Sequence, residues 1–111
     1  MRSDSRHLAA FLALGLAALV AAPTAEENYK KHCTKCHGAD GKAQTRLGKK
    51  SGAKDLSDKQ AQAKMTDEEV FKTIKLGRKN SKGEEKMDAF GEDMPDKEIT
   101  ELVAYVRTLA K

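Results

Sequence analysis

The sequence predicts a small all-α domain in which three main helices are joined by long loops. Apolar residues recur at helical spacing over residues 99–109, and a helix-capping pattern opens residues 66–77. No β-rich run surrounds the only two cysteines of the chain, Cys33 and Cys36. Together these observations favour a helical architecture over a mixed one.

The chain begins with the layout of a secretory signal peptide. Arg2, Arg6 and His7 precede an apolar run over residues 8–22, which ends in small residues. The run is shorter than the roughly 20 residues that a membrane-spanning helix needs. We therefore expect a signal peptide over residues 1–25 and one mature domain over residues 26–111.

The position of the cleavage site has two interpretations. Cleavage after Ala25 leaves an acidic start to the mature chain and is the boundary that we favour. Cleavage after Ala21 or Ala22 would instead keep Thr24 as a helix cap, with Glu27 three residues on. In either case the remaining chain is one small domain. A core of this size usually needs additional stabilisation, such as a disulfide, a metal or a bound group.

The first helix, expected over residues 26–37, ends in the most informative motif, Cys-x-x-Cys-His at residues 33–37. This motif is typical of the attachment site of a c-type haem. Residues three and four apart share a helix face, so Cys33 and Cys36 can hold one porphyrin edge by thioether bonds. His37 is then carried to the iron and serves as its proximal ligand.

Other interpretations of the motif lack support. A structural zinc site needs four ligands, and the only other histidines are His7, in the expected signal peptide, and His32, directly beside Cys33. A thioredoxin-like redox pair needs a strand–helix–strand context. A disulfide across two residues would close too short a loop to stabilise much, and it would leave His37 unexplained.

Residues 38–64 contain several glycines among lysines and show no apolar periodicity. A structureless stretch of this length needs a role in a compact domain, and wrapping one edge of a haem is such a role. A disordered basic linker is the alternative, but the chain has no second domain to link. Residues 58–64 are expected to form a short helical turn.

The second helix is predicted from clear boundary signals. Thr66 is a suitable N-cap, Glu69 completes a capping box, and Met65 can pack against Val70 as a hydrophobic staple. Gly77 is expected to end the helix.

The third helix repeats this entry, with Met94 in the staple position and Pro95 in place of the capping threonine. Its apolar residues follow the i, i+3, i+4, i+7 pattern, and they are Ile99, Leu102, Val103, Val106 and Leu109. We expect this helix to pack against the first one.

A haem held by one histidine needs a second axial ligand, and methionine is the common partner in electron-carrying c-type sites. Met1 leaves with the signal peptide, whereas Met65 and Met94 occupy the two staple positions. Met87 lies in a glycine- and charge-rich stretch, residues 80–93, with no helical pattern that would give it a core role. It is the predicted sixth ligand, and Phe90 would shield that side of the haem from water.

These motifs resemble those of small bacterial class I cytochromes c. The resemblance rests on the signal peptide, Tyr29 four residues before the motif, the sequence Cys-x-x-Cys-His-Gly-Ala-Asp-Gly at residues 33–41, Met-Asp-Ala-Phe at residues 87–90 and the final helix. It implies a class I cytochrome c fold in which the first and last helices cross near Tyr29 and Tyr105. It also implies one covalent haem c, bound through Cys33 and Cys36.

The same resemblance implies that His37 and Met87 are the axial iron ligands and that one haem edge stays partly exposed. The chain departs from the family at one position. The family often has proline after the ligand methionine, and this chain has Asp88.

Charge is distributed unevenly along the chain. Residues 30–64 hold ten basic and three acidic groups, whereas residues 84–101 hold two basic and eight acidic groups. Such a dipole can orient an incoming partner. We expect a redox partner, a reductase or an oxidase, with an acidic docking surface reached through Lys30, Lys31, Lys35, Lys42, Lys49 and Lys50. Nucleic-acid binding is disfavoured because the basic stretch lacks interleaved aromatic residues.

The predicted function is that of a soluble, monomeric electron carrier of the periplasm, which passes single electrons between redox partners of a respiratory or similar chain and transforms no substrate. The alternative is a haem enzyme or gas sensor with a labile sixth ligand. Asp88 gives that alternative slight support, but only Arg78 lies near the ligand stretch as a candidate distal group.

Overall fold

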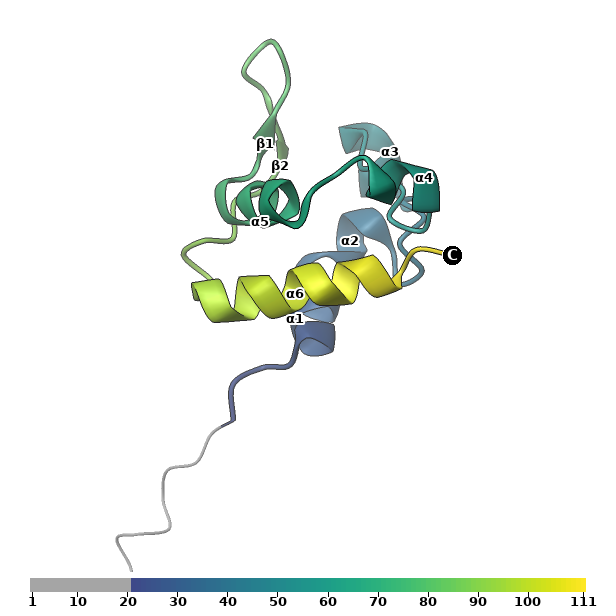
Figure 1. The fold of residues 1–111 in the computed structure, drawn as a ribbon. Helices are drawn as coiled ribbons and strands as arrows, with labels where there is room; N and C mark the ends of the chain where they lie inside the picture. The colour runs from purple at the N-terminus through teal and green to yellow at the C-terminus, as the bar shows by residue number, and fades with distance from the viewer. Residues whose placement is uncertain (1–20) are drawn as a thin grey trace, which may run out of the picture.

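The computed structural model describes residues 21–111, which form six helices and one two-stranded hairpin (Figure 1). In chain order the elements are α1 (Ala25–His32), α2 (Thr34–His37), α3 (Arg46–Ser51), α4 (Lys59–Ala63), α5 (Asp67–Leu76), β1 (Arg78–Lys79), β2 (Glu85–Met87) and α6 (Asp96–Thr108). The all-α prediction is confirmed, with the small hairpin as an addition. No helix within residues 21–111 has the length and apolar character needed to cross a bilayer.

Thr24 begins α1 through a complete capping box. Its side chain accepts a hydrogen bond from the Glu27 amide at 3.1 Å, and the Glu27 carboxylate accepts one from the Thr24 amide at 3.1 Å. A domain that started at residue 26 would lack this cap. Most of the predicted signal peptide, residues 1–25, lies outside the described residues, so its boundary stays a prediction.

The predicted first helix is broken at Cys33, which ends α1 and begins α2. The Cys33 amide donates to the Tyr29 carbonyl, and the Cys33 carbonyl accepts from the amides of Cys36 and His37. The hydrogen-bonded path therefore continues through the break. As a result, α1 leads directly into the short helix that carries the Cys-x-x-Cys-His motif.

The packing of α1 against α6 forms the centre of the core. Tyr29 is 1% exposed, and its ring lies 5.2 Å from the ring of Tyr105 at an interplanar angle of 47°. Ile99 and Leu102 of α6 are fully buried. The Asn28 amide donates to the Glu98 carboxylate at 3.0 Å across the same contact. The predicted crossing of the first and last helices is confirmed.

The long segment after the motif contains a helix that the sequence does not signal, α3. Thr45 caps this helix by accepting a hydrogen bond from the Gly48 amide at 2.9 Å, and its hydroxyl can donate to the Cys36 carbonyl at 2.8 Å. Gly48 packs so closely on α2 that an added Cβ would collide with the Cys36 carbonyl oxygen. Thr45 and Gly48 thus fix α3 against the motif.

The short helical turn expected over residues 58–64 is confirmed as α4, and it carries a buried polar group, Gln62. The Gln62 side-chain amide donates to the carbonyls of Leu56 at 2.7 Å and Val106 at 2.8 Å. Its side-chain oxygen accepts from Arg107 at 3.0 Å, and Arg107 also forms an ion pair with Asp67 at 2.9 Å. This network ties α4 and the start of α5 to the last turn of α6.

Both later helices begin and end close to the predicted boundaries. Thr66 caps α5 by accepting from the Glu69 amide at 3.1 Å, although the Glu69 carboxylate contacts the Thr66 hydroxyl rather than its backbone amide. Gly77 ends α5 with a φ of +77°. Pro95 precedes α6 without a side-chain cap, as expected.

The Gln62 network generates a stability prediction. Replacing Gln62 by leucine removes the side-chain donor of the Leu56 carbonyl and one acceptor of Arg107, so unfolding should become easier by about 1–3 kcal/mol. Denaturant unfolding of the haem-loaded protein measures the change. Gln60→Leu on the exposed face of α4 is the matched control and should change stability by less than about 0.5 kcal/mol. Equal effects of the two substitutions would contradict a stabilising role for Gln62.

Candidate functional site

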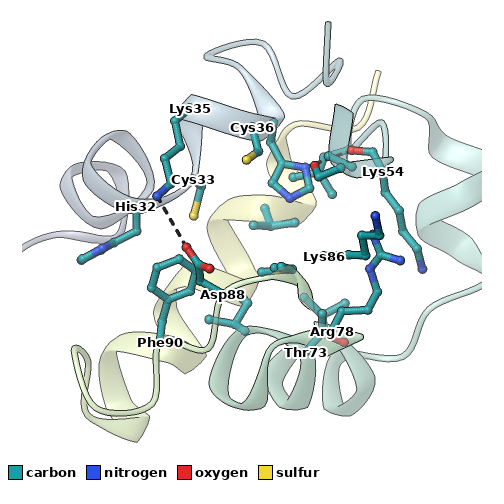
Figure 2. Close-up of a pocket in the computed structure, with 18 of the residues that line it drawn as sticks. His32, Cys33, Lys35, Cys36, Lys54, Thr73, Arg78, Lys86, Asp88 and Phe90 are labelled. Carbon is teal, nitrogen blue, oxygen red and sulfur yellow. Dashed lines mark hydrogen bonds and ion pairs between the residues drawn. The ribbon is translucent and has the colours of Figure 1, made fainter. Parts of the chain in front are cut away.

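A cavity of about 270 Å³ lies between α2, α5, α6 and the hairpin. All four residues that the sequence predicts as site residues line it, namely Cys33, Cys36, His37 and Met87. Figure 2 shows Cys33 and Asp88 on the side of the cavity opposite Arg78 and Lys86. Two segments that are distant in the sequence therefore meet at one site.

The two cysteines are free thiols at the end of α1 and within α2. Cys33 is 7% exposed, and burial raises the pKa of its thiol to about 12, with a further contribution from Cys36. The thiol is therefore neutral in this structure at ordinary pH. With both thiols lining one cavity, the pair can form two thioether bonds to a single flat group.

His37 is oriented by the backbone of the following loop. Its Nδ1 lies 3.0 Å from the Lys54 carbonyl oxygen, so this nitrogen carries the proton and Nε2 keeps its lone pair. Burial lowers the pKa of His37, the hydrogen bond to Lys54 opposes that effect, and the nearby charge of Arg78 lowers the pKa further. The ring is thus held as a neutral imidazole with one nitrogen available as a ligand.

Met87 lies at the end of β2 and not in an irregular loop. It pairs with Arg78 of β1 in an antiparallel register that contains an irregularity between Arg78 and Lys79. The hairpin extends away from the helices (Figure 1), and its turn is closed by Asn80, whose side-chain oxygen accepts from the Lys82 and Glu84 amides. The turn residues Asn80 to Gly83 are the signal that could have predicted this hairpin from the sequence.

A second methionine, Met65, also lines the cavity. Its sulfur lies 3.8 Å from the Lys54 Nζ, and its carbonyl accepts a hydrogen bond from Arg107. Met94 is 2% exposed and belongs to the core instead. The assignment of a thioether ligand therefore has to distinguish Met87 from Met65.

The rim of the cavity is mostly cationic, which sequence reasoning did not detect. The charged residues that line it are Lys35, Lys54, Arg78, Lys86 and Asp88. The one carboxylate in this set, Asp88, is paired with Lys35 at 3.5 Å, and Arg78 donates to the Gly52 carbonyl at 3.3 Å. Of the six lysines expected to form a docking surface, only Lys35 lines the cavity.

The remaining wall is apolar and is supplied mainly by α5, α6 and their connections. Val70, Ile74, Phe90 and Val106 are buried residues of this wall. Phe90, predicted to shield the site, packs against His32 with ring centroids 5.2 Å apart. Thiols at one end, cations at another and an apolar wall between them fit a flat apolar macrocycle that carries acidic groups.

A metal site made only of protein side chains finds no support in residues 21–111. Within that range, no group of three or more His, Cys, Asp and Glu residues is placed to hold an ion. The histidine that lines the cavity together with free thiols is instead suited to bind a metal already held by another group.

The chain is similar to known proteins over most of its length. A family model described as "Cytochrome C oxidase, cbb3-type, subunit III" matches residues 20–106. The chain is similar to the solved structure of "KustC0563 c-type cytochrome", with 34% identity and a TM-score of 0.69 over 80% of this chain and 100% of that chain. It is also similar to a mutant of Kustc0563, with 32% identity and a TM-score of 0.67 over 78% and 99% of the two chains. No curated protein matches it.

The approach of Gly77 to the hairpin generates a prediction about Met87. A Cβ at Gly77 would lie 2.6 Å from the Met87 carbonyl oxygen, whereas a Cβ at Gly83, which has a similar φ of +80°, would have nothing within 4 Å. Gly83→Ala should lower the free energy of unfolding by about 1–2 kcal/mol, the cost of placing a non-glycine residue at positive φ. Gly77→Ala should lower the free energy of unfolding by about 1–3 kcal/mol more. The collision contributes to this loss, and so does the backbone, because φ +77° with ψ −175° is a region open essentially to glycine alone. Denaturant unfolding measures both variants.

Gly77→Ala should also change the optical signature of the predicted sixth ligand, because the segment that must move contains Met87. Gly83→Ala should leave that signature intact. Equal stability losses and unchanged spectra for both variants would contradict a role of Gly77 in positioning Met87.

Proposed function

The chain belongs to the c-type cytochromes, a family that binds haem covalently, and we propose that it is an exported electron carrier with one haem per chain. In this proposal Cys33 and Cys36 hold the haem by thioether bonds. His37 and Met87 are its axial ligands. The observation that carries the proposal is the convergence of these four residues on one cavity.

Haem supplies an iron that changes between its ferrous and ferric states by one electron. The chain supplies the surroundings that make this exchange fast and reversible. His37 offers Nε2 because its Nδ1 is committed to the Lys54 carbonyl. Met87 offers its thioether from the hairpin, and a methionine ligand raises the reduction potential. With both ligands held by the fold, little has to reorganise when an electron is transferred.

The cations at the far side of the cavity have a role in the same proposal. Lys54, Arg78 and Lys86 line the cavity without a carboxylate partner among the described residues. A haem bound through the two cysteines carries its own carboxylates, and these cations can pair with them. Arg78 is the strongest candidate because its planar guanidinium can donate two parallel hydrogen bonds.

The proposal includes a location and a class of partner. The predicted signal peptide, residues 1–25, supports export to the periplasm. The basic segment over residues 30–64 supports a redox partner with an acidic docking surface, reached through lysines that include Lys30, Lys31, Lys35, Lys42, Lys49 and Lys50. The carrier is proposed to act as a monomer and to transform no substrate.

The sixth ligand is tested by two methionine variants of the haem-loaded protein. Met87→Ala should abolish the weak near-infrared sulfur-to-iron band of the ferric form and lower the midpoint potential. Met65→Ala is the matched control, because Met65 lines the same cavity, and it should keep the band. Loss of the band in Met65→Ala, with retention in Met87→Ala, would reverse the assignment.

Two further measurements test the function itself. The mass of the mature chain should exceed that of its amino acids by one haem, and the ferrous wild type should not bind carbon monoxide. A mass without haem would end the proposal. Rapid carbon monoxide uptake by the wild type would favour a haem enzyme or gas sensor with a labile sixth ligand, the alternative that Asp88 supports.

A further inference from the structure

One ion pair spans the mouth of the cavity. Lys35 lies in α2 between the two cysteines, and Asp88 directly follows Met87, the proposed ligand. Their charged atoms, Nζ and Oδ2, are 3.5 Å apart (Figure 2), and the two side chains are 54% and 58% exposed. The pair therefore joins α2, which carries the two-cysteine motif, to the residue that follows Met87, on the solvent side of the site.

Asp88 has a distinct electrostatic position. It is the one acidic residue among those that line the cavity, and the cationic residues of that lining are Lys35, Lys54, Arg78 and Lys86. Of these four cations, Lys35 is the one with which it forms an ion pair in the described structure. Removing the Asp88 charge would leave only cationic charged residues in the cavity lining and would free the Lys35 ammonium from its ion pair.

The pair is too weak to act as a permanent lock. Exposed ion pairs contribute little because water and salt screen both charges. A carboxylate on an incoming protein can therefore replace Asp88 on Lys35 at small cost. The exchange is nearly balanced, so Asp88 lowers the gain that any acidic partner obtains from Lys35.

We propose that Asp88 is an internal competitor for Lys35, which limits how tightly acidic redox partners dock at the mouth of the haem cavity. The inference rests on the proposed function and deepens it by naming a residue that sets partner specificity. A carrier has to release each partner after transfer, and weakening one docking contact favours release. The predicted result is a surface on which Lys35 is available only to a partner that displaces Asp88.

The test uses the ferrous haem-loaded protein and two small oxidants of opposite charge. One electron passes from the protein to hexacyanoferrate(III), an anion, giving ferric protein and hexacyanoferrate(II). In the parallel reaction, the cation tris(phenanthroline)cobalt(III) takes one electron and becomes its cobalt(II) form. The ratio of the two second-order rate constants largely removes any change in the protein's own potential, because the electron donor is the same in both reactions.

Four variants are compared with the wild type by stopped-flow mixing at low ionic strength. Asp88→Asn frees Lys35, Lys35→Gln removes it, and the double variant removes both charges. Glu101→Gln is the charge-matched control, because Glu101 is an exposed acid on α6 that does not line the cavity. Asp88→Asn and Glu101→Gln change the net charge of the protein by the same amount.

Asp88→Asn should raise the anion-to-cation rate ratio about two- to fivefold, well above the effect of Glu101→Gln. In the Lys35→Gln background, the Asp88→Asn effect should fall to that of Glu101→Gln. The difference should disappear near 1 M salt, where the screening length is only about 3 Å. Equal ratios for Asp88→Asn and Glu101→Gln, or an undiminished Asp88→Asn effect without Lys35, would overturn the proposal.

A negative result for this inference can be distinguished from a structural role of the ion pair and from failure of the proposed function. If Asp88→Asn leaves the rate ratio unchanged but weakens the near-infrared sulfur-to-iron band, the pair is a structural tie for Met87 and the proposal is wrong. If the mature chain carries no haem, the proposed function fails before this experiment begins. A haem-loaded, redox-active protein whose Asp88→Asn and Glu101→Gln variants behave alike overturns this inference alone.

Discussion

The packing of α1 against α6 is the contact on which the rest of the structure depends. Tyr29 is buried between these helices, and its hydroxyl donates to the Gly38 carbonyl at 2.6 Å, directly after the Cys-x-x-Cys-His motif. α6 also supplies Val106 to the cavity wall and Arg107 to the network that holds α4 and α5. The first and last helices of the described domain thus form one support, and the segments that carry His37 and Met87 are attached to it.

Local signals predicted much of this fold because their physics is local. Thr66 and Gly77 mark the ends of α5 by satisfying or redirecting backbone groups within a single turn, and the apolar stripe of α6 follows from helical periodicity. Helix α3 was missed because its stability comes from outside itself. Gly48 packs against the Cys36 carbonyl, and the Thr45 hydroxyl forms a hydrogen bond with the same carbonyl. Both contacts are tertiary, so the sequence alone does not reveal the role of either residue.

In the candidate site, too, some residues could be predicted from the sequence and others could not. Cys33, Cys36 and His37 follow from a contiguous motif, and Met87 was selected by elimination among four methionines. The hairpin that carries Met87 was not expected, because two-residue and three-residue strands leave almost no alternating pattern. The cationic rim depends on Lys54, Arg78 and Lys86 meeting in space. Counting charges along the chain located a basic segment but could not show which side chains face the cavity.

The order of the elements along the chain has a consequence for biosynthesis. Translation proceeds from the N-terminus, so the cysteines are made long before α6, which completes the wall around them. At ordinary ribosomal speeds this interval is on the order of ten seconds. During that time Cys33 lacks the α6 contacts of the finished core. The Cys33 thiol is thus more accessible before α6 packs than in the finished domain, where Cys33 is 7% exposed.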